Sequence, residues 1–414
     1  ADFNRDGALD VAVAATDRLA VWLADGGRFR RVADTPVKGS DLTVIDFNDD
    51  AIPDLVNAGA LVLGVGNGTF ALIRSTTFQE TYVTAAGDVD GDGDTDFAAA
   101  GFELRLWRND GGTLVPEVVG PAPIATDLKI ADLDGDGVQE LIVLTGDLGS
   151  RTILVYRSAA TANRLWFALR ADLGSYRLAT GDFGGDGRKE IAVRANGAVQ
   201  LYAATPEPHL VGQVTGLPGF EPRFAADFDH DGRDDLLLLR EGTKSTTPLF
   251  YRNDGAVALL PGRGGFTFGA PVVVAEELAA IDVNIGDFDG DGNRDVAIDV
   301  SATTEIAYGD GRGAFQRAAM PYDVRTAYLP FRVMQVADLD GDGRDEILGM
   351  YDFGPIVALF LGGRGEAARR VVTIQTALRY AFAVGQVDRE GMDIVTFASV
   401  LPGLCEPSTH RRPR

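Results

Sequence analysis

The chain of 414 residues carries 38 Lys and Arg against 61 Asp and Glu, which gives a formal net charge of −23. Because phosphate backbones are bound by clustered basic side chains, this balance excludes a nucleic-acid partner and instead indicates cations. A single cysteine, Cys405, excludes an internal disulfide framework and a cysteine-based zinc site, and no apolar run is long enough for a membrane span.

An acidic phrase of nine residues recurs along the chain and sets its organisation. The copies lie at residues 2–10, 46–54, 88–96, 132–140, 182–190, 227–235, 287–295 and 338–346. Their first residues are about 40 to 60 residues apart, which is the period of a propeller blade or a solenoid turn. The repeats therefore replace the two or three domains that chain length alone would suggest.

Short apolar runs on both sides of each phrase predict strands. In the fourth repeat, residues 128–131 precede the phrase and residues 141–144 follow it. In the third repeat, a third strand at residues 104–107 leads through a Gly-rich turn to a fourth at residues 114–119. Four short strands per repeat and no helical periodicity predict an all-β fold, a β-propeller of about eight four-stranded blades. Seven blades with extra strands are the alternative.

The two ends of the chain are expected to meet. A degraded ninth copy at residues 386–393 has Gln386 at its first position, and a strand at residues 381–387 could complete the N-terminal blade and close the ring. We expect residues 1–400 to form one propeller domain and residues 401–414 to be a disordered tail. Because Ala1 falls inside a repeat, we expect the chain to be a fragment whose missing start says nothing about export.

The pattern D-x-D-x-D-G-x-x-D predicts a calcium loop. Side chains at positions 1, 3 and 5 can converge on one point, a backbone carbonyl at position 7 can join them, and the acid at position 9 can close the cage. Calcium selects such oxygen ligands, whereas magnesium is smaller and stricter in geometry. Glycine at position 6, such as Gly93, permits the positive φ of the tight turn.

The expected side-chain ligands can be given loop by loop. They are Asp2, Asn4, Asp6 and Asp10; Asp46, Asn48, Asp50 and Asp54; Asp88, Asp90, Asp92 and Asp96; Asp132, Asp134, Asp136 and Glu140; Asp182, Asp186 and Glu190; Asp227, Asp229, Asp231 and Asp235; Asp287, Asp289, Asp291 and Asp295; and Asp338, Asp340, Asp342 and Glu346. The expected carbonyl ligands are those of Asp94, Val138, Arg233, Asn293 and Arg344.

Two other interpretations of the phrase are weaker. An EF-hand would need a bidentate Glu at position 12 and flanking helices, but that position holds Ala99 or Val143 inside strand-like runs. Turn chemistry explains one Asp and one Gly, not four acids at fixed offsets repeated eight times. Nearly half of the 61 acidic residues lie at positions 1, 3, 5 and 9 of these loops, and their mutual repulsion makes empty loops unfavourable.

The loops are not expected to be equal. The fifth has Gly184 at position 3 and lacks one ligand, whereas the second has a neutral Asn48 and Ala51 in place of the preferred glycine. We expect these two to bind metal most weakly. The first is doubtful because it lies at the N-terminus.

The repeats resemble the FG-GAP/VCBS family of integrin α-chain propellers and bacterial secreted proteins. The resemblance rests on the eight loops and on the literal Phe268-Gly269-Ala270-Pro271, and it covers nearly the whole chain. It implies several bound calcium ions in an extracellular, cell-surface or periplasmic protein. It does not fix a function, because such propellers include adhesion modules, lectins and a few enzymes.

Third-strand aromatic residues, two long repeat intervals and three histidines are further features of the sequence. Aromatic residues recur at comparable places in the third strands, and we expect them to pack between blades rather than to stack on sugars. They are Trp22, Trp107, Tyr156, Tyr202, Tyr308 and Phe360. The spacing between repeats is longer at residues 203–223 and 240–255. These insertions could form a binding face or be neutral surface loops, and the sequence favours neither. His230 is expected to face solvent, His209 has no visible catalytic partner, and His410 lies in the expected disordered tail.

Three functions compete. We favour a binding or adhesion module for a carbohydrate or protein ligand, because the usual catalytic residues are scarce. A polysaccharide lyase similar to rhamnogalacturonan lyases is the first alternative, since a Lys, Arg or Tyr could act near a calcium-bound uronate. A structural scaffold of a larger secreted protein is the second.

Overall fold

The computed structural model describes residues 1–383 with several gaps. The gaps are residues 16–17, 26–27, 37–41, 49, 58–59, 76–82, 112, 148–149, 158–163, 173–174, 244–251, 301–302, 320–330, 339–341, 352–355, 361–369 and 375–379. All regular elements in the described part are β-strands, so the all-β prediction is confirmed. No helix there is long and apolar enough to cross a membrane.

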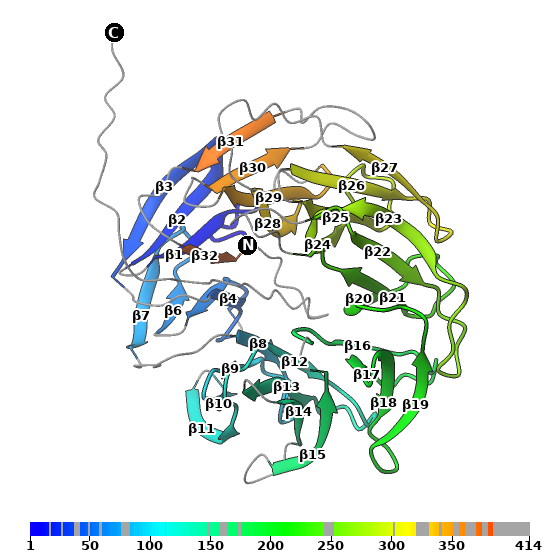
Figure 1. Ribbon diagram of the computed structural model, residues 1–414. Coiled ribbons are helices and arrows are strands. Elements are labelled where there is room, and N and C mark those ends of the chain that lie inside the picture. Colours follow the sequence, from blue (N-terminus) through cyan, green and yellow to red (C-terminus); the bar gives the residue numbers. More distant parts are fainter. Residues whose placement is uncertain are drawn as a thin grey trace.

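The described strands form eight four-stranded antiparallel sheets, each a meander of neighbouring strands. Figure 1 shows the sheets standing around a common centre, with the first strand of each sheet innermost and the fourth at the rim. Inner strands of adjacent sheets contact one another, as β4 does β8 and β16 does β20. This is the arrangement of a β-propeller.

The strand bounds follow the repeat. The sheets are β32, β1, β2 and β3 (Tyr380–Ala383, Val11–Ala15, Leu19–Asp25, Arg28–Thr35); β4 to β7 (Leu42–Ile45, Asp54–Asn57, Ala60–Gly64, Phe70–Ser75); β8 to β11 (Val83–Gly87, Asp96–Ala100, Glu103–Asp110, Thr113–Pro121); β12 to β15 (Asp127–Ala131, Glu140–Asp147, Ser150–Arg157, Arg164–Ala171); β16 to β19 (Ala179–Gly181, Glu190–Ala195, Ala198–Ala203, His209–Val214); β20 to β23 (Glu221–Ala226, Asp235–Arg240, Gly255–Leu260, Val272–Leu278); β24 to β27 (Ala280–Gly286, Asp295–Val300, Thr303–Gly309, Phe315–Ala319); and β28 to β31 (Phe331–Ala337, Glu346–Tyr351, Ile356–Phe360, Arg370–Ile374).

The last strand closes the ring onto the first sheet. Ala383 of β32 pairs with Ala12 of β1 in antiparallel register, so the innermost strand of the N-terminal sheet comes from the other end of the chain. The prediction that the C-terminal segment completes this blade is confirmed over Tyr380–Ala383. The degraded ninth copy and the expected tail at 401–414 lie outside the described residues.

The core lies between neighbouring sheets. Trp107 of β10 is 4% exposed and packs with Phe47 and Val56 of the preceding repeat. Tyr156 of β14 packs in the same way against the sheet before it. These third-strand aromatics therefore pack between blades, as expected.

The prediction that these aromatic residues occupy the same place in every third strand is wrong in the last two repeats. Trp107 pairs with Phe97, the residue after loop position 9, and Trp22, Tyr156 and Tyr202 share this register. In the last two repeats Ala307 and Leu359 hold it instead, so Tyr308 and Phe360 lie one residue later. A shift of one residue moves a side chain to the other face of a strand.

The stretch at residues 203–223 contains regular structure. It contains the fourth strand β19 and the start of β20, and Val211, Leu217 and Phe220 join the apolar cluster between the fifth and sixth repeats. Much of this longer spacing therefore serves packing. In the other long interval, residues 244–251 lie outside the described part.

Candidate metal loops

Each acidic phrase connects the first strand of its sheet to the second, as residues 88–96 connect β8 to β9. First strands run in the same direction in every blade of a meander propeller, so the loops lie on one face of the ring, which we call the loop face. Position 9 of each phrase begins the second strand. The first two strands of each sheet therefore hold the two ends of its loop in place.

The acid at position 1 closes the loop on itself. In the third loop, the Gly93 amide donates to Asp88 Oδ2 over 3.0 Å, and the same bond between positions 6 and 1 is present in all eight loops at 2.8 to 3.0 Å. Position 6 has a positive φ throughout, including φ 59° at Ala51. The predicted need for glycine is therefore real, because L-residues with side chains rarely adopt this conformation.

The acid at position 5 fixes the second half of the turn. Its Oδ1 accepts the amide of position 7, as in the bond from Asp94 N to Asp92 Oδ1 at 2.9 Å, and this bond too recurs in all eight loops. Such side-chain acceptors hold a tight turn without strand pairing. The local fold of the loop thus depends on positions 1, 5 and 6.

The acid at position 9 is buried and supports the backbone. Asp96 is 0% exposed; its Oδ2 accepts the Val89 amide and its Oδ1 accepts the Asn109 amide of the third strand, both at 2.8 Å. The five loops that have Asp here all bind two backbone amides in this way. This role was not foreseen from the sequence, which assigned position 9 to metal alone.

The glutamate at position 9 of the fourth loop behaves differently, whereas Glu190 of the fifth accepts two backbone amides, those of Phe183 and Gly184. In the fourth loop, Glu140 Oε2 accepts the Leu133 amide at 2.8 Å. The side chain is fully buried, and its Oε1 has no hydrogen-bond partner. A buried carboxylate oxygen without a partner is costly unless a cation or a proton satisfies it.

Burial also shifts the protonation of position 9. Desolvation, opposed by the two backbone hydrogen bonds, raises the pKa of Asp54, Asp96 and Asp295 to about 7. Desolvation and the neighbouring loop acids raise the pKa of Glu140 to about 8. A cation beside these carboxylates would favour their ionised form.

Position 2 anchors each loop in the core, which the sequence analysis missed. Its side chain is apolar and at most 2% exposed in the first seven loops; these residues are Phe3, Phe47, Val89, Leu133, Phe183, Phe228 and Phe288. The signal was present in the sequence as an apolar residue after every first acid. The anchor holds position 1 close to the sheet.

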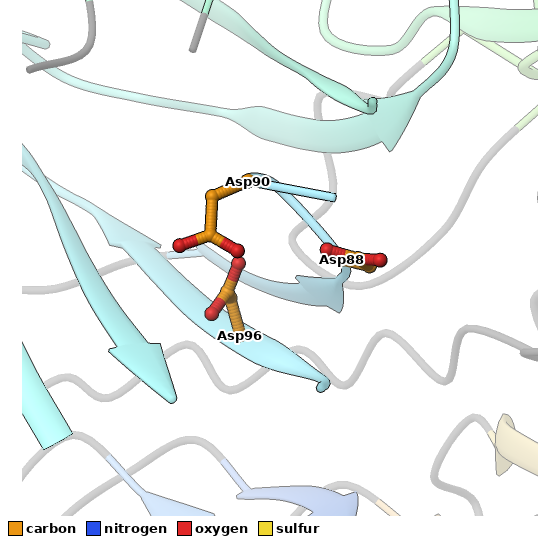
Figure 2. Close-up of side chains that lie close together, drawn as sticks. All are labelled: Asp88, Asp90 and Asp96. Carbon is orange, nitrogen blue, oxygen red and sulfur yellow. The ribbon is translucent and has the colours of Figure 1, made fainter. Parts of the chain in front are cut away.

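In four loops the carboxylates converge. Three acids each offer an oxygen within 4.8 Å of the others; the groups are Asp88, Asp90 and Asp96; Asp132, Asp134 and Asp136; Asp227, Asp229 and Asp235; and Asp287, Asp289 and Asp291. Figure 2 shows Asp90 and Asp96 facing one another, with Asp88 beside them. Only oxygen donors are present, which is the donor set that calcium takes.

The remaining loops form no such group in the described part of the chain. The first and second have Asn4 and Asn48 at position 3, and the fifth has Gly184. In the eighth, Asp340 lies outside the described residues. The four converging loops are thus those with an acid at positions 1, 3, 5 and 9, all of them described.

A neighbouring segment explains the fifth loop. The amides of Gly265 and Phe266 donate to the carbonyls of Gly184 and Phe183 at 3.0 and 3.1 Å. A Cβ on Gly184 would lie 2.7 Å from Cε1 of Phe266. The turn before β23 therefore covers the place that a position 3 side chain would need.

Adjacent loops are joined around the face. The amide of position 8 donates to the position 1 carbonyl of the preceding loop, as Gln139 does to Asp88 at 3.2 Å and Asp345 to Asp287 at 2.7 Å. His230 is exposed, as expected, but its Nε2 lies 3.0 Å from Asn293 Oδ1 in the next loop. His209 is also exposed and contacts the Glu207 carbonyl.

Comparisons with known proteins agree with this architecture. The FG-GAP-like repeat model matches residues 2–57, 88–143 and 227–298. Each of these three matched regions contains at least one acidic phrase. The comparison with curated proteins found no significant match.

Several solved structures are similar. A lectin from Agrocybe aegerita that recognises non-reducing terminal N-acetylglucosamine aligns with a TM-score of 0.51 and 17% identity, over 88% of this chain and 90% of that chain. BBS1N in complex with ARL6DN aligns with a TM-score of 0.47 and 13% identity, over 80% of this chain and 94% of that chain. The Photorhabdus luminescens Tc holotoxin pore aligns with a TM-score of 0.34 and 15% identity, over 82% of this chain and 18% of that chain. At such identity the first likeness shows a shared fold.

Proposed function

Because this chain is a β-propeller of the FG-GAP-repeat family, we propose that it is a calcium-loaded binding module for a carbohydrate or protein ligand. The observation that carries the proposal is the convergence of three carboxylates in each of four loops on one face of the ring. Calcium would be part of the fold, since it would neutralise acids that otherwise repel one another.

The residues present fit the ion. In the fourth loop, Asp132, Asp134 and Asp136 would hold calcium together with the unpartnered Glu140 Oε1. In the third, Asp88, Asp90 and Asp96 would do so. When bound, the ion supplies charge neutralisation and rigidity; the chain's own acids and backbone amides keep the loop in shape whether or not it is bound.

The proposed setting is outside the cytoplasm: extracellular, cell-surface or periplasmic. Extracellular calcium modules work with dissociation constants of roughly 10⁻⁴ to 10⁻³ M, and millimolar calcium keeps such sites filled. FG-GAP repeats are typical of extracellular proteins, which supports this setting. Exposed sites of this kind would be largely empty at cytosolic calcium levels.

A carbohydrate is the first ligand to test. The lectin from Agrocybe aegerita shares the fold, and a ring of blades presents a broad face on which a saccharide can rest. The propeller would bind the ligand without converting it. A protein ligand is the second choice, and both would be recognised by side chains outside the loops.

A glycan array probed in calcium, in magnesium and in excess EDTA tests the proposal. We expect binding to a defined group of glycans that calcium supports better than magnesium and that EDTA removes. An array without calcium-dependent binding contradicts a carbohydrate ligand. Release of unsaturated uronate products from acidic polysaccharides, abolished by chelator, would replace the binding module by a lyase.

A further inference from the structure

The third strands of the third and fourth repeats contain an arginine at a place where the other repeats have an apolar or aromatic residue. The residue after position 9 pairs with a residue of the third strand, as Phe97 does with Trp107. The arginine is the next residue along that third strand. This place holds Arg108 and Arg157 in the third and fourth repeats. In the other repeats the same register holds Leu23, Leu63, Ala203, Pro261, Tyr308 and Phe360.

Both arginines contact the acid at position 3 of their own loop. Arg157 Nη2 bonds to Asp134 Oδ2 and lies 3.4 Å from Asp136 Oδ2. Arg108 Nη1 lies 3.5 Å from Asp90 Oδ2. Position 3 is the acid that distinguishes the converging loops, so the two guanidinium groups meet the carboxylates that a cation would bind.

Each arginine also has an anchor on the fourth strand. The guanidinium of Arg157 lies over the ring of Trp166 on β15, 4.7 Å from its centroid. Arg108 Nη2 lies 3.3 Å from Glu117 on β11. A cation–π contact or an ion pair can retain the guanidinium when it leaves the loop. The arginine thus bridges loop and fourth strand and has a second place to go.

The fourth loop still has unsatisfied capacity for a cation. Glu140 Oε1 is buried without a hydrogen-bond partner although Arg157 contacts Asp134 and Asp136. The guanidinium therefore does not satisfy every carboxylate of the loop. In the sixth loop, by contrast, Arg233 contacts the position 5 acid Asp231 rather than position 3.

We propose that Arg157 and Arg108 are tethered counter-ions that compete with calcium in the fourth and third loops. Each holds its loop together when calcium is scarce and must leave the position 3 acid when calcium enters. The loops therefore bind calcium more weakly than the same acids would without an arginine. The inference rests on the proposed calcium binding but concerns residues that are not metal ligands.

Arg157→Gln tests the inference, with Arg105→Gln as the matched control. Arg105 lies on β10, is partly exposed and pairs with Glu103, which belongs to no acidic phrase. Both variants remove one positive charge. In calorimetric titrations we expect one site of Arg157→Gln to bind calcium about fivefold more tightly, since a partly exposed ion pair of this kind shifts an equilibrium by about that factor. Arg105→Gln should leave every site unchanged.

Melting temperatures supply an independent readout. Without calcium, Arg157→Gln should melt below the wild type, because its loop acids lose their counter-ion; in saturating calcium the difference should disappear or reverse. An equal loss in both conditions with unchanged affinity would overturn the inference and leave Arg157 a structural residue. Arg108→Gln repeats the test in the third loop if Arg157→Gln does not fold. A wild-type protein that binds no calcium would instead overturn the proposed function on which the inference rests.

Discussion

The first, second and fifth loops share the hydrogen bonds of the third, fourth, sixth and seventh loops, yet only the latter four bring three carboxylates within 4.8 Å in the described part of the chain. Positions 1, 5 and 9 hold the backbone in all seven. Position 3 alone differs in kind between the two groups. The shape of the loop and its capacity for a cation are thus encoded by different residues.

The loops without a position 3 acid contain their own replacements for a cation. In the first and second loops, the side-chain amides of Asn4 and Asn48 donate to the position 5 acids Asp6 and Asp50 at 2.8 and 3.0 Å. In the fifth, Phe266 lies against Gly184. One strategy supplies a neutral donor to a carboxylate, and the other fills the place with an aromatic ring.

Removing metal from the whole ring should have the largest effect. Excess EDTA is expected to lower the free energy of unfolding by several kcal/mol, because a site filled at 100 times its dissociation constant contributes about 2.7 kcal/mol. Calcium should restore the melting temperature better than magnesium. EDTA loaded with calcium beforehand is the control, and a melting temperature unchanged by free EDTA would refute metal binding.

Breaking the shared scaffold should have the next largest effect, even without metal. Asp235→Ala removes the acceptor of two buried amides, those of Phe228 at 2.9 Å and Gly262 at 2.6 Å. Each unsatisfied amide costs about 1 to 3 kcal/mol, so we expect a loss of about 2 to 6 kcal/mol in urea unfolding with EDTA present.

The matched control for the scaffold is Asp34→Ala, which removes an exposed acid that pairs with the exposed Arg31. Exposed pairs contribute at most about 1 kcal/mol. If Asp235→Ala lost no more than this control, position 9 would be a metal ligand and not a support of the backbone.

Much of the architecture could be predicted from the sequence because it repeats. The recurring phrase fixes where strands end, and four apolar runs per period lead to four-stranded sheets. The closing strand was predicted because residue 1 follows the place of a missing first strand. Ala381, the expected start of that strand, pairs with Ala14.

What could not be predicted depends on contacts between repeats or on register. Phe266 reaches Gly184 from the next sheet, and no spacing in the sequence announces that approach. From residue type alone, Arg108 and Arg157 would be taken for ordinary surface arginines. Only the strand register shows that they contact the loop acids Asp90 and Asp134. The one-residue offset of Tyr308 was missed because aromatic type was compared without the pairing that defines register.

Single-site variants sharpen the comparison by counting ions. Asp134→Ala and Asp289→Ala should each lose one calcium in calorimetry, because each removes an acid from a converging group. Asp182→Ala should lose less calcium, since the fifth loop lacks its position 3 acid. It will still lower stability, because Asp182 accepts the amides of Gly185 and Gly187. Equal loss of calcium in all three variants would contradict the division between the two groups of loops.

Adding the missing acid should have the smallest effect on stability and gives the most direct test of position 3. Asn48 is exposed in the second loop, whose backbone already matches that of the converging loops. In Asn48→Asp, a carboxylate replaces the amide that donates to Asp50. We expect a loss of less than about 1 kcal/mol without calcium, because the repulsion is exposed to solvent, and the gain of one calcium in calorimetric counts.

Gly184→Asp is the control that separates charge from space. It adds the same acid at the same position of the fifth loop, but its Cβ would meet the Phe266 ring at 2.7 Å. Because the ring or the turn that carries it must move, this variant should lose stability in either condition and gain no ion. A calcium gained by Gly184→Asp but not by Asn48→Asp would reverse the argument: the backbone of the second loop, with Ala51 at φ 59°, would then limit binding rather than its position 3 side chain.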